Sequence, residues 1–248
     1  MIRPGALGWQ QPDRLPVLDA TSVHVWRAAL DQPDELVAAL AGHLSPEEEF
    51  RVCGYQRPLD RRRFILCRGL LRRLLGAYLS LPPAHVGFML GSQGKPRLAL
   101  AGDALDLRFN VSHSESVALF AVALGREVGV DLEHVRPLVE AETISEQFFS
   151  EREKQLLAML PEEAQLEAFF RCWTRKEAYV KARACAAELA LPAIDVDFEG
   201  TGEPTNALLG PAAATWAIAP LTPAPGYIGA LAVEGAHYEL ARFHLSVC

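Results

Sequence analysis

The sequence GVDLE at Gly129–Glu133 decides how the fold is interpreted. Apolar residues alternate with carboxylates in this stretch, so on a β-strand Asp131 and Glu133 project from the same face. The same alternation occurs at Ile194–Phe198, and such a triplet is more often a half-buried strand with a solvated face than a site. Alternation alone therefore predicts a strand and leaves its chemistry open.

A second stretch, WTRKEAYVKA at Trp173–Ala182, has helical spacing. Glu177 and Lys181 are four residues apart, so on a helix they lie one turn apart on one face, and by default they form a weak surface pair. Together with Asp131 and Glu133, however, Glu177 would supply hard oxygen ligands suited to Mg²⁺, which also binds substrate phosphates. A lysine one turn away is then placed to meet a phosphate oxygen. The two stretches together predict a metal and phosphate site.

The paired stretches resemble the signature of the 4′-phosphopantetheinyl transferases, in particular the larger, pseudo-dimeric kind that activates surfactin synthetase. Three further segments agree with this resemblance: GKP at Gly94–Pro96, FNVSHS at Phe109–Ser114 and FFSERE at Phe148–Glu153. The match runs from about Leu44 to Phe198. The tryptophan-lysine-glutamate-alanine helix with its trailing lysine is the specific part, and the other segments support it.

The resemblance implies an α+β fold of two similar α/β halves related by a pseudo-twofold axis, with antiparallel sheets and packed helices. Coenzyme A is then expected in the cleft between the halves. A weak internal echo is visible, because Leu107–Val111 and Val117–Leu124 resemble Thr215–Ala219 and Tyr227–Val233 as strand-turn-strand units. We place the boundary near Val128, so that residues 1–127 contact the nucleotide of coenzyme A and residues 128–248 carry the metal site and the catalytic helix.

The implied reaction moves the 4′-phosphopantetheine arm of coenzyme A to a serine of an apo acyl or peptidyl carrier protein and releases 3′,5′-ADP. Mg²⁺, for which Mn²⁺ is an expected substitute, would neutralise and orient the pyrophosphate. Its expected ligands are Asp131, Glu133 and Glu177. Lys181 would stabilise the charge that accumulates as the bond breaks. Glu153 is the expected base, since a hydroxyl is a poor nucleophile unless its proton leaves.

Several residues near this site have competing interpretations. Glu153 lies early in an expected helix, where the helix dipole alone favours acidic residues, and Glu151 and Glu142 compete for the role of base. Lys176 lies about 100° around the helix from the third carboxylate and is either solvated or functional. Trp173 is expected to be a core aromatic that anchors the helix against the other half.

The phosphates of coenzyme A need fixed cations, and arginine suits phosphate. The resemblance aligns Arg63 best with the 3′-phosphate, places Lys95 near the adenine, and assigns Ser112 and His113 to a phosphate contact at a strand end. Without the resemblance, a histidine beside a serine is more often structural. The arginine that holds the 3′-phosphate stays open among Arg51, Arg57, Arg61, Arg62 and Arg63.

Composition sets outer limits on the function. The formal net charge of −7 argues against a general nucleic-acid binder. The segment Arg51–Arg73 nevertheless holds eight arginines and only one acid, Asp60. The segment is either a solvated helix face or a site for an anionic ligand or partner, and Arg61–Arg73 within it is one candidate docking surface for carrier proteins, which are generally acidic near their modified serine.

Three further expectations concern the state of the protein. The longest apolar run, Val117–Leu124, has eight residues, and the amino terminus lacks a secretory signal, so we expect a cytoplasmic protein with no membrane partner. Five cysteines without CxxC spacing indicate reduced thiols. Because two halves occur in one chain, we expect a monomer.

Two rival functions stay open. One is another metal-dependent phosphoanhydride hydrolase with the same carboxylates, which hydrolysis of coenzyme A without an acceptor would favour. The other is a non-catalytic partner protein that keeps the coenzyme A cleft; loss of a carboxylate or of Lys181 would mark it, and all of these residues are present. The sequence does not reveal whether a fatty-acid, polyketide or nonribosomal-peptide carrier is the natural acceptor.

Hydrophobic periodicity and capping signals also predict the order of secondary structure. The expected strands are Ser22–Trp26, Arg97–Leu100, Leu107–Val111, Val117–Leu124, the stretch with Asp131, Ala193–Phe198, Thr215–Ala219, Tyr227–Val233 and Tyr238–Leu245. The expected helices run from Ser45 to Gly54, from a cap at Asp60 to before Pro82, from near Ser150 to before Pro161, and from about Glu162 to Ala186.

Overall fold

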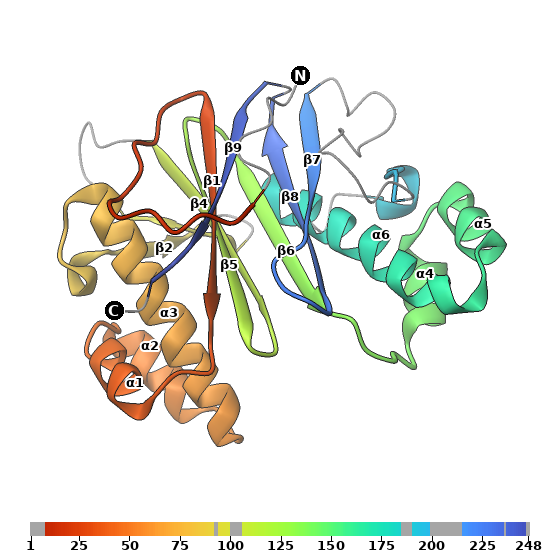
Figure 1. The fold of residues 1–248 in the computed structure, drawn as a ribbon. Coiled ribbons are helices and arrows are strands. Elements are labelled where there is room, and N and C mark those ends of the chain that lie inside the picture. Colours follow the sequence, from red (N-terminus) through yellow and green to blue (C-terminus); the bar gives the residue numbers. More distant parts are fainter. Residues whose placement is uncertain are drawn as a thin grey trace.

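The computed structural model describes residues 8–91, 94–99, 106–184, 190–198, 215–235 and 237–246. Two β-sheets lie in the middle of the molecule, with helices α1–α3 on one side and α4–α6 on the other (Figure 1). The elements are β1 (Ser22–Ala29), α1 (Asp34–Ala41), α2 (Pro46–Cys53), α3 (Pro58–Leu79), η1 (Pro83–His85), β2 (Phe88–Leu90), β3 (Pro96–Leu98), β4 (Leu107–Ser114), β5 (Val117–Leu124), β6 (Val128–His134), α4 (Ala141–Phe148), α5 (Glu151–Met159), α6 (Glu162–Arg183), η3 (Leu191–Ala193), β7 (Trp216–Leu221), β8 (Tyr227–Glu234) and β9 (Glu239–His244).

The two large sheets share one topology. The first has the strand order β4-β5-β1-β9 and the second the order β6-β8-β7. In each, an opening strand (β1 or β6) is followed by three helices and then, in order, by an antiparallel pair whose second strand pairs with the opening strand. This repeat confirms the expected α+β fold of two similar halves, and the echo seen in the sequence falls on the two antiparallel pairs.

Alternating side chains divide the core into layers. On β1, Val23 and Val25 pack in a buried cluster with residues of β5, β6, β7 and β8, between the two sheets. Trp26 and Ala28 belong to a second cluster with the apolar face of α3. A third cluster joins α6 to Ile218 and neighbouring residues on the outer face of the second sheet. The period of two along each strand therefore builds a helix–sheet–sheet–helix arrangement.

The long helices α3 and α6 correspond closely. Each has 22 residues and ends beside a residue in the left-handed region, Ser80 (φ 55°) or Ala184 (φ 51°). Each follows a short helix whose N-terminus has a capping box, Ser45 with Glu48 before α3 and Ser150 with Glu153 before α6. The structural repeat therefore extends to the helices as well as the sheets.

The structure corrects two sequence expectations and adds one strand pairing that the sequence did not predict. Helix α3 begins at Pro58 and has Arg57 at its N-cap, so Asp60 lies in the first turn instead of capping it. The strand expected at Ala193–Phe198 is absent, because Ala193 ends the 3-10 turn η3 (Leu191–Ala193) and, of residues 194–198, only Val196 makes a bridge. Strand β9 pairs in parallel with β1, so the end of the chain completes the first sheet rather than the second. The division of the chain into two halves at Val128 stays a prediction.

None of the helices in the described ranges is long and apolar enough to cross a membrane. Three cysteines lie within these ranges, all as free thiols: Cys67 and Cys172 are buried and Cys53 is exposed. Cys185 and Cys248 lie outside the described residues.

Candidate functional site

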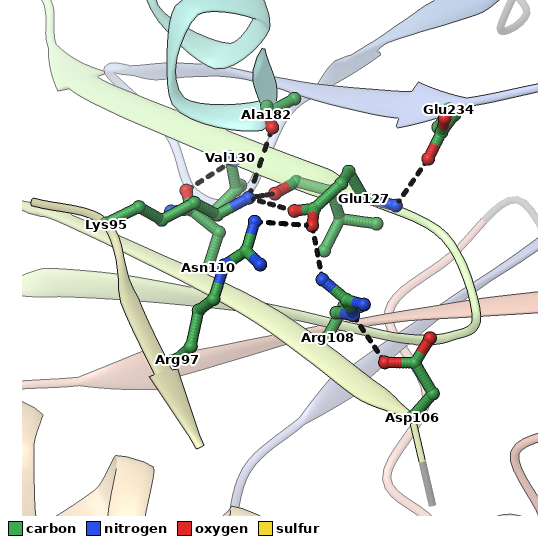
Figure 2. A network of polar contacts seen from close by, with 10 residues as sticks. Lys95, Arg97, Asp106, Arg108, Asn110, Glu127, Val130, Ala182 and Glu234 are labelled. Atoms are coloured by element: carbon green, nitrogen blue, oxygen red, sulfur yellow. Dashed lines mark hydrogen bonds and ion pairs between the residues drawn. The ribbon is translucent and has the colours of Figure 1, made fainter. Parts of the chain in front are cut away.

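Polar side chains join the two halves where β4 lies beside β6. Asn110, Ser112 and Ser114 occupy every second position of β4, so they share one face of the strand. The first of them ties the two backbones together, because the Oδ1 atom of Asn110 accepts a hydrogen bond of 2.8 Å from the amide of Val130 (Figure 2). We call these three β4 residues the seam. The sequence shows this pattern as N-x-S-x-S, but only Ser112 was singled out from it.

The seam also holds the two carboxylates of β6. The hydroxyl of Ser112 donates to Oδ1 of Asp131 at 3.0 Å, and that of Ser114 donates to Oε2 of Glu133 at 3.1 Å. Ser112 is therefore a partner of Asp131 in this structure, whereas the sequence analysis assigned it to a phosphate of coenzyme A. The two carboxylates are held from the first half although they belong to the second.

A glycine lets helix α6 approach this strand. A Cβ atom at Gly129 would lie 2.1 Å from the carbonyl oxygen of Ala178 and 2.3 Å from the amide nitrogen of Ala182. Both contacts are with helix backbone, which cannot turn aside as a side chain can. The glycine at the start of the GVDLE stretch therefore permits the close packing of α6 on β6, two residues before Asp131.

Helix α6 brings Lys181 onto the first carboxylate. The Nζ atom of Lys181 lies 2.5 Å from Oδ1 of Asp131 and 3.1 Å from Oγ of Ser112. Asp131 is only 4% exposed, and its Oδ2 atom is buried without a hydrogen-bond partner in the described parts of the chain. One oxygen of this carboxylate is thus paired with an ammonium group, and the other has its acceptor capacity unused.

The three predicted carboxylates influence one another electrostatically. Burial raises the pKa of Glu177, Asp131 and Glu133 raise it further, and Lys181 opposes them. Burial and then Asp131 likewise raise the pKa of Glu133. The structure therefore brings together the strand and helix residues that the sequence paired. Across the described ranges, no three histidine, cysteine, aspartate or glutamate side chains already stand in a metal-holding arrangement.

Positive groups lie on the adjoining surface. Arg63 pairs with Glu115 at 2.9 Å, and its Nε atom is buried without a partner in the described parts of the chain. His113 is an exposed residue, yet desolvation of its imidazole by the surrounding protein lowers its pKa, and the charges of Lys181, Arg63 and Arg51 lower it further. Three cations therefore act on one imidazole, which suits this surface to an anion.

The basic segment Arg51–Arg73 does not form one surface. Arg68 and Arg72 turn inward to Glu48, with N–O distances of 3.3 and 2.8 Å, and Arg62 pairs with Asp34. The exposed arginines of the segment are Arg51, Arg57 and Arg61. The docking surface suggested by the sequence is therefore smaller than the run of arginines indicates.

Lys95 enters a network that joins the halves (Figure 2). Its Nζ atom lies 2.8 Å from Oε2 of Glu127, 2.9 Å from the carbonyl oxygen of Val128 and 3.2 Å from that of Ala182. Ala182 belongs to the last turn of α6, where carbonyl groups lack partners within the helix. Burial lowers the pKa of Lys95, and the hydrogen bond and charge of Glu127 oppose this. The side chain that was expected near adenine thus caps the helix of Lys181.

Glu153 is buried, and both of its carboxylate oxygens have partners. It is 0% exposed, accepts hydrogen bonds from the amides of Ser150 and Val196, and pairs with Lys176 at 2.8 Å. Lys176, for which a solvated position was one expectation, is also 0% exposed. These contacts do not support Glu153 as the base, and that role stays an untested prediction. Trp173 packs on Phe148 of α4, within its own half instead of against the other half.

The second acidic triplet, at Ile194–Phe198, has contacts that differ from those of the carboxylate cluster formed by Asp131, Glu133 and Glu177. Ser150 donates a hydrogen bond to Asp195, and the backbone carbonyl of Asp197 accepts one from Arg175. Neither Asp195 nor Asp197 lies on a regular strand. The two acidic triplets that looked alike in sequence therefore have different surroundings.

Comparisons with known proteins agree along most of the chain. A family model described as "4'-phosphopantetheinyl transferase superfamily" matches residues 127–232, and one described as "4'-phosphopantetheinyl transferase, N-terminal" matches residues 26–124. The 4'-phosphopantetheinyl transferase HetI of a Nostoc species is 39% identical over 94% of this chain and 96% of its own. The 4'-phosphopantetheinyl transferase Sfp of Bacillus subtilis is 26% identical over 64% of this chain and 69% of its own.

Proposed function

The chain belongs to the 4′-phosphopantetheinyl transferase superfamily, and from this premise we propose how its residues transfer the phosphopantetheine arm of coenzyme A to a serine of a carrier protein. The observation that carries the proposal is the meeting of Asp131 and Glu133 on β6 with Glu177 and Lys181 on α6, at the junction of the two halves. Coenzyme A as the substrate fits the family.

We propose that Asp131, Glu133 and Glu177 hold Mg²⁺. Carboxylate oxygens are the ligands this ion prefers. The buried Oδ2 atom of Asp131 has no partner in the described parts of the chain, which leaves one carboxylate oxygen for the ion. The pKa values of Glu133 and Glu177 are raised first by burial and then by the charge of Asp131, and a bound cation would offset both effects. When bound, the ion would neutralise the pyrophosphate and orient it for attack. Mn²⁺ is the expected substitute.

The cations would then bind and orient coenzyme A. Arg63 and His113 lie together on the surface next to the carboxylates, which supports them as ligands of the 3′-phosphate. Lys181 would exchange its contact with Asp131 for the pyrophosphate, where its charge matters most as the bond breaks. Ser112 would keep Asp131 oriented through its hydrogen bond rather than contact the phosphate itself.

The attacking serine must lose a proton as its oxygen bonds to phosphorus and the pyrophosphate bond breaks. Among the carboxylates of the cluster, Glu177 has no hydrogen bond within the described residues, whereas Asp131 and Glu133 accept bonds from the seam. In the metal-free protein its raised pKa also makes it a stronger base than an ordinary carboxylate. Glu177 is therefore our second candidate for the base, beside its predicted role as a metal ligand.

Incubation with coenzyme A, Mg²⁺ and an apo carrier protein, followed by mass measurement of the carrier, tests the proposal. We expect the carrier to gain one phosphopantetheine and 3′,5′-ADP to appear, with no gain when Mg²⁺ is chelated. Cleavage of coenzyme A without a carrier would instead identify a phosphoanhydride hydrolase. Binding of coenzyme A with no turnover on acyl or peptidyl carriers would identify a non-catalytic partner. Since one chain supplies both sides of the site, we expect a monomer to be active.

A further inference from the structure

Each half of the molecule contains an equivalent ion pair in which the cation is buried. In the second half, Lys176 of α6 pairs with Glu153, the third residue of the capping-box helix α5, at 2.8 Å. In the first half, Arg72 of α3 pairs at 2.8 Å with Glu48, the third residue of the capping-box helix α2. Lys176 and Arg72 each lie fourteen residues after the first residue of a 22-residue helix. The two pairs therefore occupy equivalent places.

The further contacts of the two cations also correspond. Arg72 donates to the carbonyl oxygens of Pro83 and Val86, at 3.4 and 2.7 Å, which are the first residue of the turn η1 and the residue that follows it. Lys176 donates to those of Leu191 and Ile194, at 2.9 and 2.6 Å, which hold the same places around η3. In both halves one buried cation thus links the long helix to the capping-box helix and to the turn that follows the long helix.

The first half has the equivalent ion pair but none of the predicted metal ligands. The predicted metal ligands Asp131, Glu133 and Glu177 all lie in the second half. Glu48 makes the equivalent contacts in a half with no predicted metal ligand, so we assign those contacts a structural role. The role of Glu153 is then explained by its contacts with Lys176, and no proton transfer needs to be assigned to it.

We propose that Glu153 and Lys176 are positioning residues, which fix the rotation of α6 so that Glu177 and Lys181 face β6. This inference rests on the proposed transferase function. Lys176 directly precedes Glu177, so a helix rotated or shifted at Lys176 displaces Glu177 first. Lys176 is 0% exposed, and removal of either partner leaves a buried charge unpaired, which favours displacement of the helix.

Four variants test this, with turnover expressed per folded molecule. Glu153→Gln and Lys176→Met should each lower kcat by about a hundredfold, the effect of a displacement of roughly 1 Å, while the KM for coenzyme A changes little. The double variant should be no worse than either single one, because both remove the same constraint. Lys176→Arg, which places in α6 the cation that α3 has at this position, should retain most of the activity.

The matched control is Glu48→Gln in the first half. It should lower the unfolding midpoint in denaturant about as much as Glu153→Gln, yet leave kcat per folded molecule unchanged, because α3 carries no carboxylate of the cluster. The acidic limb of the pH–kcat profile should be the same in Glu153→Gln as in the unchanged protein. Where Glu153→Gln fails to fold, the same limb is measured in Lys176→Arg, and we again expect no shift.

Three results would overturn the inference: disappearance of the acidic limb in Glu153→Gln, a displaced limb in Lys176→Arg, or loss of kcat in Glu153→Gln but not in Lys176→Met. Each would return Glu153 to the role of base. Failure of the proposed function looks different, since the unchanged protein would then modify no carrier. The interaction energy between Glu153 and Lys176 can still be measured in that case, because it comes from the unfolding free energies of the single and double variants and does not depend on transfer.

Discussion

The Nζ atom of Lys181 lies 2.5 Å from Oδ1 of Asp131, while Oδ2 of the same carboxylate is buried and without a partner in the described parts of the chain. An ammonium group and a divalent cation at this carboxylate repel each other, because both carry positive charge at short range. Metal binding and the position of Lys181 are therefore linked, and coenzyme A would provide the lysine with an alternative anionic partner.

Lys181→Met should strengthen Mg²⁺ binding in the absence of coenzyme A and yet lower transfer. The first effect follows because the competing charge is gone. The second follows because loss of one group that stabilises developing charge lowers kcat about 10²- to 10³-fold. Calorimetric titration with Mg²⁺ and a single-turnover assay measure the two effects. Weaker metal binding in the variant would show that the lysine supports the metal site instead of competing with it.

Glu177→Gln should separate the two roles proposed for this residue. If Glu177 is chiefly a ligand, the variant needs more Mg²⁺ and recovers kcat at saturation. If it is the base, kcat stays low at saturating Mg²⁺ and the acidic limb of the pH profile disappears. Asp131→Asn is the comparison, since it removes a metal ligand that already accepts a hydrogen bond from Ser112. Full activity of Glu177→Gln would exclude both roles.

The same variant should stabilise the metal-free protein at neutral pH. The pKa of Glu177 is raised in the folded state, so its contribution to stability is present at low pH and is lost as pH rises through that pKa. Glu177→Gln removes this loss and should raise the free energy of unfolding by about 0.5–2 kcal/mol at neutral pH. The gain should shrink as the pH falls toward the ordinary pKa of glutamate. A gain independent of pH would point to a cause other than charge.

Gly129→Ala should disrupt the site through the backbone. The new Cβ atom would meet Ala178 and Ala182 at 2.1 and 2.3 Å, so α6 must move away from β6. Overpacking of this kind lowers the free energy of unfolding by about 1–3 kcal/mol. The transfer rate of the molecules that remain folded should also fall, because α6 carries Glu177 and Lys181. Gly42→Ala is the control, because its Cβ atom would meet only the carbonyl oxygen of Ala39 at an ordinary 3.5 Å. Normal transfer by Gly129→Ala would show that α6 can shift without consequence.

Lys95→Met should destabilise the junction more than it weakens coenzyme A binding. It removes hydrogen bonds to Val128 and Ala182, leaving their carbonyl groups buried, at a cost of about 1–3 kcal/mol. Arg97→Met is the matched control, since Arg97 also pairs with Glu127 but is 47% exposed and has no contact with α6 among the hydrogen bonds described. An unchanged unfolding midpoint with a large rise in the KM for coenzyme A would restore the predicted contact near adenine.

Arg63→Ala should weaken coenzyme A more than dephospho-coenzyme A, because only the former carries the 3′-phosphate. Loss of one charge-assisted hydrogen bond predicts a difference of about 1.5–3 kcal/mol. The buried Nε atom without a partner supports an anion at this position. Binding of both ligands is compared by calorimetry. Equal losses would move Arg63 to carrier docking or to its structural pair with Glu115.

Local patterns predicted most elements of the fold, because strand alternation and capping boxes act within a few residues. The strand of Asp131 and the helix of Glu177 were expected and are present. The partners of buried charges were less predictable. The helical spacing separated Lys181 from Lys176, but it did not show that tertiary packing buries Lys176 completely and brings Lys181 to Asp131. Lys95 and Glu127 are far apart along the chain, and no local pattern joins them.

The pairing of β9 with β1 was likewise beyond reach, because nothing near Glu239 in the sequence specifies which sheet edge it joins. Gly129 was quoted as part of a motif, but its physical reason, the approach of α6, needs the position of another element. Local patterns therefore predicted groups that the structure brings together, while their contacts could be seen only in the structure.

The seam makes the site more sensitive to insertion and deletion than to substitution. Asn110, Ser112 and Ser114 reach β6 only because they fall on one parity of the strand, while Val111 and His113 fall on the other. Deleting a single residue before Asn110 would exchange these two sets along the whole of β4. Val111 and His113 would then face the carboxylates of β6, and the hydroxyl groups of Ser112 and Ser114 would both be lost from them at once. The number of β4 residues before Asn110 therefore matters as much for the contacts of Asp131 and Glu133 as the identity of any residue in the strand.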